Sequence, residues 1–434
     1  MKSYNFIKNE NGSEFFELTA QQKFMLDDDE TNKGFVDRCA GTFNVPVPIR
    51  LYGNLDIARF EESIRKTIEY YDSLRIMYFN VNGGFKQKFI EKLDFKLKVT
   101  EAEGDTKEER EKFAMDNIVK FVNAPINTDT NMEKIMWNYV LYKIDEKDHI
   151  FVFMMHHSMS DGTSQQLMGR TLLNFYSSAD NGEPKLYREY VKYDREFKES
   201  ERGRKQIEYW HNELKDYQEI DLALIAPKEK ETEKHVIFKT DMKLMDSICA
   251  KTGISRLVAY MAAYHIALSR ILNNLDVVIG LSCANRTKIR FLKTLGYFSR
   301  AAQNRVILRE DMKLTELLDV LKEKISKNVE AQQTADLNEQ GQFMISYGAY
   351  KVVTGRQKLN DDIECEILQV NPERAFRFFI ICAYEYPDYV LSDLHGNPNV
   401  FSIEFQEKLA DYIQRTLEAM NENTDNTVGG IMQK

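Results

Sequence analysis

Cysteine is scarce in this sequence, and no two cysteines lie close together. The five are Cys39, Cys249, Cys283, Cys365 and Cys382, an odd number that includes no CxxC pair. Isolated cysteines favour neither a disulfide framework nor a cysteine-based zinc site. We therefore predict a protein of the reducing cytoplasm, in which Cys283 is a packing residue.

Long apolar runs are also missing. The first residues, MKSYNFIKNENGSEFFELTAQQ, lack the apolar core of a signal peptide, and no stretch approaches the roughly 18 apolar residues of a membrane helix. The net charge is only -9, and the lysines and arginines are dispersed along the chain. We predict no integral membrane segment and no nucleic-acid partner.

The 434 residues exceed what a single ordinary core holds, and they contain no internal repeat. Helical and strand-like patterns are mixed in both halves, which predicts an α/β fold of two lobes. We place the lobes at residues 1–183 and 184–434, and the polar stretch APKEKETEKH (226–235) is a candidate linker or surface loop.

Apolar periodicity locates the main elements. Helices are predicted at 56–75 with Asp56 as cap, and at 106–124, 162–177, 184–222, 255–272, 313–333 and 403–420. Strands are predicted at 74–79, 84–90, 95–99, 135–144, 149–157, 276–284, 342–350, 363–370 and 375–384.

The segment MMHHSMSDGTS is the most informative part of the chain, because an apolar strand ends there in two histidines. Side chains alternate along a strand, so His156 and His157 cannot both face one pocket. This weakens a metal site at the pair, and the other histidines show no ligand spacing with it. One histidine facing a cleft suits a general base.

Two neighbours extend this chemistry. The N–H of Gly162, near a helix start, suits an oxyanion. Asp161 suits three roles: orienting a histidine, capping the helix, or pairing with a distant arginine. The residues alone leave open a plainer interpretation, which is a core histidine pair, a capping aspartate and a turn glycine.

The motif resembles the HHxxxDG motif of the chloramphenicol acetyltransferase-like superfamily, and most closely that of nonribosomal peptide synthetase condensation domains and their free-standing acyltransferase relatives. Other stretches follow in the family's order. They are LTAQQKFML, YDSLRIMYF with its Arg75, YREYVKYDREF, QIEYWHNEL, LVAYMAAYHIALSRILNNLDVVIGLSCANR and LGYFSRAAQNRVIL. The resemblance covers the chain from about Leu18 to the last helix.

The resemblance implies two chloramphenicol acetyltransferase-like lobes in a V, with an active-site tunnel between them. It implies that His157 is the catalytic base, that Gly162 lines the oxyanion region, and that His156 is structural. It also implies that Asp161 pairs with an arginine, which we assign as Arg75.

The same resemblance implies an acyl transfer that needs no metal or tightly bound cofactor. The donor is an acyl thioester of coenzyme A or of the phosphopantetheine of a carrier protein. The sequence shows no obvious carrier domain, so we expect this donor in trans. The acceptor is a small amine or alcohol.

Departures from the family pattern keep alternatives open. Phe298-Ser299-Arg300-Ala301 replaces the usual Phe-Val-Asn-Thr, and we predict that Arg300, Ser346 and Tyr347 line the substrate tunnel. For Arg300 the alternative is a surface salt bridge. For the whole chain, one alternative is a catalytically inactive, condensation-like module that docks carrier proteins. Another is a glycerolipid acyltransferase, because His156 and Asp161 match its Hx₄D spacing.

Overall fold

The computed structural model describes residues 7–8, 14–32, 41–81, 84–126, 135–229, 235–335, 341–349, 355–374, 376 and 378–433. The chain forms two compact units. Unit 1 comprises residues 1–197, 286–298 and 352–373, and unit 2 comprises 198–285, 299–351 and 374–434. Among the described residues, no helix combines the length and apolar composition that crossing a membrane requires.

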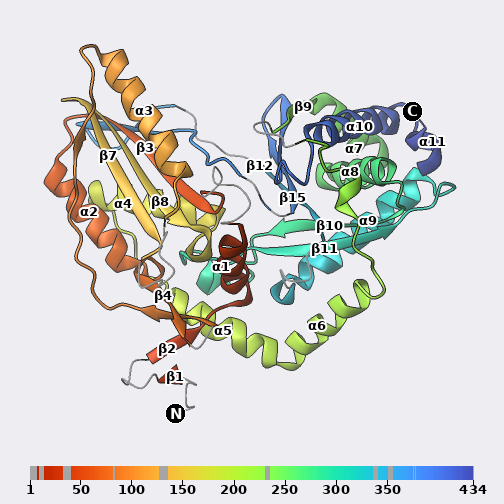
Figure 1. The fold of residues 1–434 in the computed structure, drawn as a ribbon, viewed down its shortest axis with the longest axis horizontal. Helices are drawn as coiled ribbons and strands as arrows, with labels where there is room; N and C mark the ends of the chain where they lie inside the picture. Colours follow the sequence, from red (N-terminus) through yellow and green to blue (C-terminus); the bar gives the residue numbers. More distant parts are fainter. Residues whose placement is uncertain are drawn as a thin grey trace. The chain divides into compact units, whose positions relative to one another are not determined.

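Unit 1 is built on a six-stranded sheet in the order β13-β14-β3-β8-β7-β6, with a four-stranded sheet in the order β1-β2-β5-β4. Its elements are β1 (Ile7–Lys8), β2 (Glu14–Glu17), α1 (Ala20–Asn32), β3 (Asn44–Gly53), α2 (Ile57–Tyr70), η2 (Asp72–Arg75), β4 (Ile76–Val81), β5 (Gly84–Phe89), β6 (Thr100–Glu101), α3 (Lys107–Asn123), β7 (Trp137–Asp145), β8 (Asp148–His156), η3 (His157–Met159), α4 (Gly162–Tyr176), most of α5 (Tyr187–Glu199), η5 (Ile289–Phe291), β13 (Gln357–Lys358) and β14 (Ile363–Ile367) (Figure 1).

Strand β8 is buried on both faces, which explains its unbroken apolar run. Phe151, Phe153 and Met155 pack into one core with residues of α2 and α4. Ile150, Val152 and Met154 pack into a second core with α3 on the opposite face. A central strand covered on both sides reads as continuously hydrophobic.

Unit 2 is built on a mixed sheet in the order β11-β10-β12-β15-β16-β9. Its elements are α6 (Glu201–Glu213), η4 (Leu222–Leu224), β9 (Ile237–Asp241), α7 (Met242–Thr252), α8 (Arg256–Leu272), β10 (Asp276–Cys283), β11 (Arg300–Ile307), α9 (Leu314–Glu330), η6 (Gln332–Thr334), β12 (Phe343–Ala349), β15 (Phe379–Glu385), β16 (Tyr389–His395), α10 (Ile403–Glu422) and α11 (Val428–Met432). Helices α7, α8 and α10 gather beside this sheet, and α8 is buried almost all round (Figure 1).

Most predicted elements are present, and Asp56 caps α2 by accepting from the N–H of Arg59. The predicted strand at 95–99 is wrong, because side chains satisfy its backbone: the N–H of Leu97 bonds Glu61, and that of Lys98 bonds Tyr139. The predicted 184–222 helix is two helices, α5 and α6. Residue 350 and residues 230–234 of the candidate linker lie outside the described residues.

The units also differ from the lobe limits predicted at 183 and 184. Helix α5 packs with unit 1, because the N–H of Tyr187 bonds the carboxylate of Asp72 at 2.7 Å and its ring meets that of Phe298. Residues 286–298 and 352–373 return to unit 1 from the second half of the chain. Strand β14, for example, pairs antiparallel with β3.

Candidate functional site

The candidate site lies in unit 1, where β8 ends and the chain turns into α4. His156 is the last residue of β8, and His157 is the first residue of the short helix η3. The predicted alternation therefore stops at this pair, and the turn itself separates the two rings. The N–H of His157 donates to the carbonyl oxygen of Phe43 at 2.7 Å, which continues the contact with β3 for one residue beyond the strand.

His156 is buried and forms local hydrogen bonds. Its Nδ1 accepts from the N–H of Ser158 at 3.1 Å and lies 2.8 Å from the Ser158 hydroxyl. The Ser160 hydroxyl donates to the His156 carbonyl oxygen at 3.1 Å. These bonds hold the turn in shape, and that His156 is structural and not catalytic stays a prediction.

The ring of His157 is partly exposed and packs against Tyr297. The two ring centroids are 4.8 Å apart, with the planes at 74°. An edge-to-face contact of this kind fixes the orientation of a ring without using its lone pair. Tyr297 was not among the predicted site residues, and it lies in the 286–298 segment that returns to unit 1.

A buried network of polar side chains supports the η3 turn. The Tyr78 hydroxyl donates to the Ser158 carbonyl oxygen at 3.1 Å and accepts from the amide of Gln22 at 3.2 Å. Gln22 also bonds the side chain of Gln87 at 2.9 Å. Burial raises the pKa of Tyr78 to about 12, so its hydroxyl remains protonated as a donor. The network ties α1, β4 and β5 to the turn that carries His157.

Asp161 caps α4 and pairs with an arginine, but the arginine is not Arg75. Its Oδ1 accepts from the N–H of Ser164 at 2.8 Å and from Nη2 of Arg286 at 3.0 Å. Both side chains of this ion pair are at most 5% exposed. The predicted Asp161–Arg75 pair is therefore wrong.

Arg75 lies in η2 and is satisfied by backbone carbonyl groups. It donates to the carbonyl oxygens of Ile68, Glu69 and Ile90 at 2.6 to 2.9 Å. Burial lowers its pKa, and these carbonyls compensate for the lost hydration. It supports the fold near α2 and β5 without contacting Asp161.

Arg286 organises the returning segment around Asp161. Its Nη1 donates to the carbonyl oxygens of Phe291 and Thr294 at 3.0 and 2.6 Å, and its guanidinium lies 4.0 Å from the centroid of the Phe298 ring. The second oxygen of Asp161 accepts from the N–H of Phe298 at 3.1 Å. Asp161 thus links the N-terminus of α4 to the 286–298 segment.

The Gly-x-Phe stretch has a packing explanation. A Cβ atom at Gly296 would overlap the ring of Tyr187, which is fully buried. The Tyr187 hydroxyl donates to the Tyr297 carbonyl oxygen at 2.9 Å, and the Ser164 hydroxyl donates to the Gly296 carbonyl oxygen at 2.7 Å. These contacts place the backbone of Tyr297, and with it the ring that meets His157.

Gly162 is the first residue of α4 and is exposed, with nothing within 4 Å of a Cβ built on it. The first N–H groups of a helix have no acceptor inside the helix and lie at the positive end of its dipole. The geometry leaves this N–H available to an anionic oxygen. His157 and Gly162 lie at the two ends of one short turn, between β8 and α4.

The other predicted residues belong to unit 2. Arg300 begins β11 and is 1% exposed, so the alternative of a surface salt bridge is wrong. It lies opposite Cys283 in the register, on the face of β11 that also carries Ala302 and Val306. Ser346 and Tyr347 lie on β12, and the Tyr347 hydroxyl donates to Glu385 at 2.9 Å. That these three residues line a tunnel stays a prediction.

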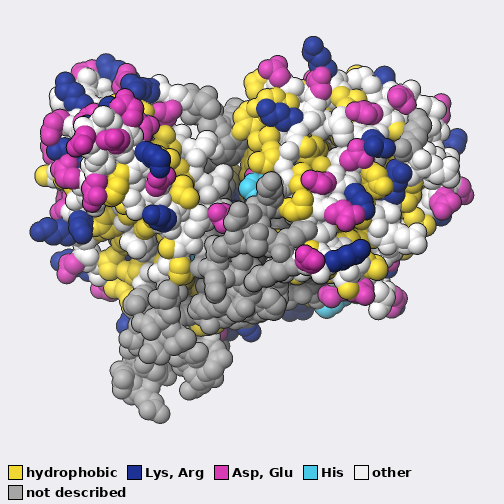
Figure 2. All heavy atoms as spheres, turned by 45° about the horizontal axis from the view of Figure 1, so that its top comes forward, with side chains coloured by type: hydrophobic (Ala, Val, Ile, Leu, Met, Phe, Trp, Pro, Cys, Tyr) yellow, Lys and Arg dark blue, Asp and Glu magenta, His cyan; other side chains and the backbone are white. Residues whose placement is uncertain are grey.

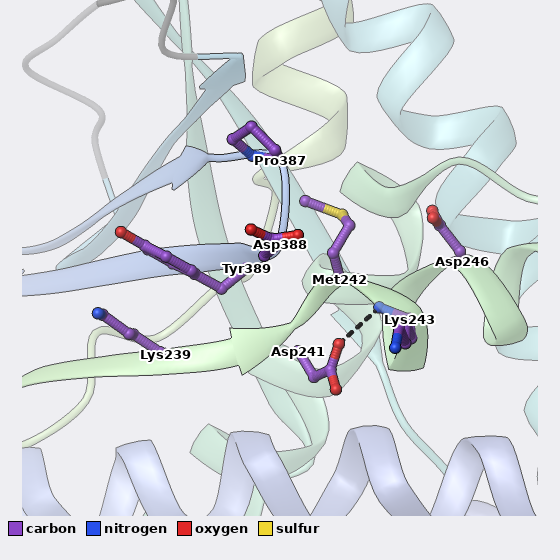
Figure 3. A pocket seen from close by; sticks show the side chains of 8 residues that line it. All are labelled: Lys239, Asp241, Met242, Lys243, Asp246, Pro387, Asp388 and Tyr389. Carbon is purple, nitrogen blue, oxygen red and sulfur yellow. Dashed lines mark hydrogen bonds between the residues drawn. The ribbon is translucent and has the colours of Figure 1, made fainter. Parts of the chain in front are cut away.

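A separate pocket of about 530 Å³ lies in unit 2. It is lined by Lys239, Asp241, Met242, Lys243, Asp246, Pro387, Asp388 and Tyr389. Figure 3 shows its charged side chains around the ends of β9 and β16, and Lys239 lies 4.3 Å from the centroid of the Tyr389 ring. The pocket contains no histidine and no predicted site residue, so it is not our candidate for the chemistry.

Surface charge is mixed on the visible face of the molecule. Figure 2 shows Lys and Arg side chains interspersed with Asp and Glu, without a broad patch of one sign. This agrees with the dispersed charges of the sequence.

Known proteins resemble this chain over most of its length. Surfactin synthase subunit 2 of Bacillus subtilis (strain 168) is 24% identical over 422 residues, which are 92% of this chain and 11% of that protein. The chain thus spans about a tenth of the length of this relative. A solved complex of the X-domain and OxyB from teicoplanin biosynthesis matches with a TM-score of 0.79 and 17% identity, covering 96% of each chain.

A third relative is the starter condensation domain of rhizomide synthetase RzmA, solved as a point mutant in complex with C8-CoA. It matches with a TM-score of 0.72 and 17% identity, covering 96% of each chain. These likenesses confirm the predicted α/β fold of two chloramphenicol acetyltransferase-like lobes. The family model named Condensation domain matches residues 36–345. The resemblance seen in the motifs is thereby confirmed, and the chain belongs to the condensation-domain family.

Proposed function

We propose that this chain is a condensation-type acyltransferase. It moves an acyl group from a thioester, carried by coenzyme A or by a carrier protein in trans, to an amine or hydroxyl acceptor. The observation that carries the proposal is the placement of His157. Its partly exposed ring is held by a backbone bond and an aromatic contact, one turn before the N-terminus of α4.

In the proposed reaction, the acceptor loses one proton and gains the acyl group of the thioester. An imidazole nitrogen of His157 takes the proton of the acceptor as the acceptor nitrogen or oxygen attacks the thioester carbonyl carbon. Negative charge develops on the carbonyl oxygen, where the N–H of Gly162 stabilises it. The intermediate then collapses, the carbon–sulfur bond breaks, and the departing thiolate takes the proton from His157. No metal or tightly bound cofactor takes part.

The family and one relative support a thioester donor without identifying it. One relative was solved in complex with C8-CoA, which makes an acyl-coenzyme A a reasonable first substrate. Surfactin synthase is a much longer protein, and this chain matches only a small part of it. We place the protein in the cytoplasm, where both donor types are made.

The test is a thiol-release assay with acyl-coenzyme A donors of several chain lengths and with acylated carrier protein, each with and without small amines and alcohols. We expect turnover with at least one donor, and we expect His157→Ala to lower kcat by about 10²- to 10⁴-fold. His211→Ala, at an exposed histidine of α6, is the control and should retain full activity. Full activity in His157→Ala would overturn the assignment.

The second candidate is a non-catalytic module that docks another protein. It is favoured by the likeness to an X-domain that was solved in complex with OxyB. Absence of turnover with every donor, combined with submicromolar binding of a carrier protein that His157→Ala leaves unchanged, would favour this second candidate.

A further inference from the structure

Two histidines and an aspartate of unit 2 lie side by side on one face of its sheet. Asp393 and His395 are two residues apart on β16, so they share a face. Asp393 is paired with Ile237 of β9, and the N–H of Leu394 bonds the Val236 carbonyl oxygen at 3.0 Å. The ladder therefore continues past the start of β9 and brings His235 opposite His395.

This face of the sheet is the one turned away from the helices. Val390 and Leu394, the alternate residues of β16, belong to the core that includes α8 and α10. Ser392 also points that way, because its hydroxyl lies 2.6 Å from that of Tyr260 on α8. The three-residue cluster consequently projects from the opposite face and is not part of the core.

The distances suit a metal ion. Nε2 of His235 lies 3.4 Å from one oxygen of Asp393, and Nε2 of His395 lies 3.1 Å from the other. One ligand atom from each of the three residues fits within 4.8 Å of the others. Zinc ligands at about 2.0–2.1 Å in a tetrahedron are roughly 3.3 Å apart, so only small side-chain adjustments are needed.

The state of the ligands fits as well. Oδ1 of Asp393 is buried and accepts no hydrogen bond from the described residues. It lies 3.4 Å from Nε2 of His235 without forming a hydrogen bond, and a cation held between the two atoms would satisfy this buried oxygen. The side chain of His235 is half exposed, so the cluster can be reached from solvent.

We propose that His235, Asp393 and His395 bind a divalent transition-metal ion, with zinc as the best fit, and that the ion fastens the start of β9 to β16. Two imidazoles and a carboxylate leave a fourth position for water, and this ligand set selects zinc and its neighbours over magnesium and calcium. Among the strands of the described residues, β9 is the edge of its sheet and pairs on one side only. An ion bridging His235 to β16 anchors that edge where its ladder begins.

A metal ion at this cluster departs from the expectation, implied by the family resemblance, that the protein needs no metal. It concerns another unit and assigns the ion no part in acyl transfer. One nearby positive charge, on the guanidinium of Arg374, opposes a cation at this cluster. Removing this charge should therefore strengthen metal binding.

The experiment is a titration of the purified full chain, free of any affinity tag, with Zn²⁺ in competition with a chromophoric chelator. Co²⁺ provides a second probe, because its visible absorption reports tetrahedral coordination. We expect one tight site per chain, and binding weakened about tenfold or more in His235→Gln and Asp393→Asn. His235→Gln changes a half-exposed side chain, so it tests the site without threatening the fold.

His211→Gln is the matched control, because it removes an exposed histidine outside the cluster. It should bind zinc as tightly as the wild type. Arg374→Gln should bind more tightly, and Zn²⁺ should raise the Tm of the wild type but not of His235→Gln. Equal affinities in wild type and His235→Gln, or no gain in Arg374→Gln, would overturn the proposal.

Discussion

The guanidinium of Arg286 donates to the carboxylate of Asp161, with Nη2 and Oδ1 3.0 Å apart, across 125 residues of sequence. The same carboxylate caps α4 and accepts from the backbone of Phe298. A single aspartate thereby joins the turn after the histidine pair to the segment that carries Tyr297. The predicted pairing of Asp161 with Arg75 is wrong, so variants of Arg286 are the ones that test the ion pair.

The first prediction concerns this ion pair. Asp161→Ala leaves a buried guanidinium without its counter-charge, and breaking such a pair from one side costs about 3–5 kcal/mol of the free energy of unfolding. Urea unfolding measures the loss. Lys112→Ala is the control, because its partner Asp116 is on the exposed surface of α3, and it should cost less than about 1 kcal/mol.

Double-mutant cycles separate the two arginines. Asp161→Ala and Arg286→Ala should be strongly coupled, because each removes the other's partner. Asp161→Ala and Arg75→Ala should be additive, since Arg75 bonds backbone carbonyls instead. Coupling with Arg75 and additivity with Arg286 would contradict the pairing in the structure.

The second prediction isolates the N–H of Gly162. Proline is tolerated at the first position of a helix, and the residue before it must be extended, as Asp161 is with φ -142 and ψ -179. Gly162→Pro should therefore fold normally while removing the N–H. If that group stabilises an oxyanion, kcat should fall about 10²- to 10³-fold.

Gly162→Ala is the matched control, because it keeps the N–H and its Cβ would have nothing within 4 Å. It should retain most of the wild-type kcat. Equal activity in the proline and alanine variants would show that the N–H of Gly162 takes no part in the reaction.

The third prediction concerns Gly296. Its alanine variant forces a Cβ into the ring of Tyr187, which cannot move because it is fully buried. Overpacking of this kind costs about 1–3 kcal/mol of the free energy of unfolding. Gly348→Ala adds a Cβ with nothing within 4 Å and serves as the control. A stability of Gly296→Ala equal to wild type would show that the two residues are not in close contact.

The fourth prediction concerns acid stability and His265 on α8. Burial, with a smaller contribution from Lys324, lowers the pKa of this histidine to about 3. Neither ring nitrogen has a hydrogen-bond partner in the described part of the chain. In the unfolded chain the ring takes up a proton near pH 6.5, roughly the pKa of free histidine. The folded state therefore loses stability as the pH falls from about 6.5 towards 3.

His265→Leu removes this proton uptake and keeps an apolar side chain in the core. Its free energy of unfolding should fall less than that of the wild type between pH 7 and pH 4, as measured by urea unfolding at each pH. The same decrease in both proteins would contradict a buried, neutral His265.

The sequence alone determined the family and the class of fold. The apolar run 150–155 predicted a buried strand, because burial on both faces removes polar residues from a strand, and β8 is such a strand. The helix cap at Asp56 was equally predictable from the sequence, because its hydrogen bond reaches only three residues along the chain. Local patterns record local geometry and burial.

The tertiary structure alone decided which distant residues meet. Arg286 reaches Asp161 only because residues 286–298 return to unit 1. The sequence around either residue does not indicate that return. His235 meets Asp393 and His395 only through the register of β9 against β16. Apolar periodicity indicates which face of a helix or strand is buried. Which distant residues contact one another depends on how the chain folds back, and that is a property of the whole fold.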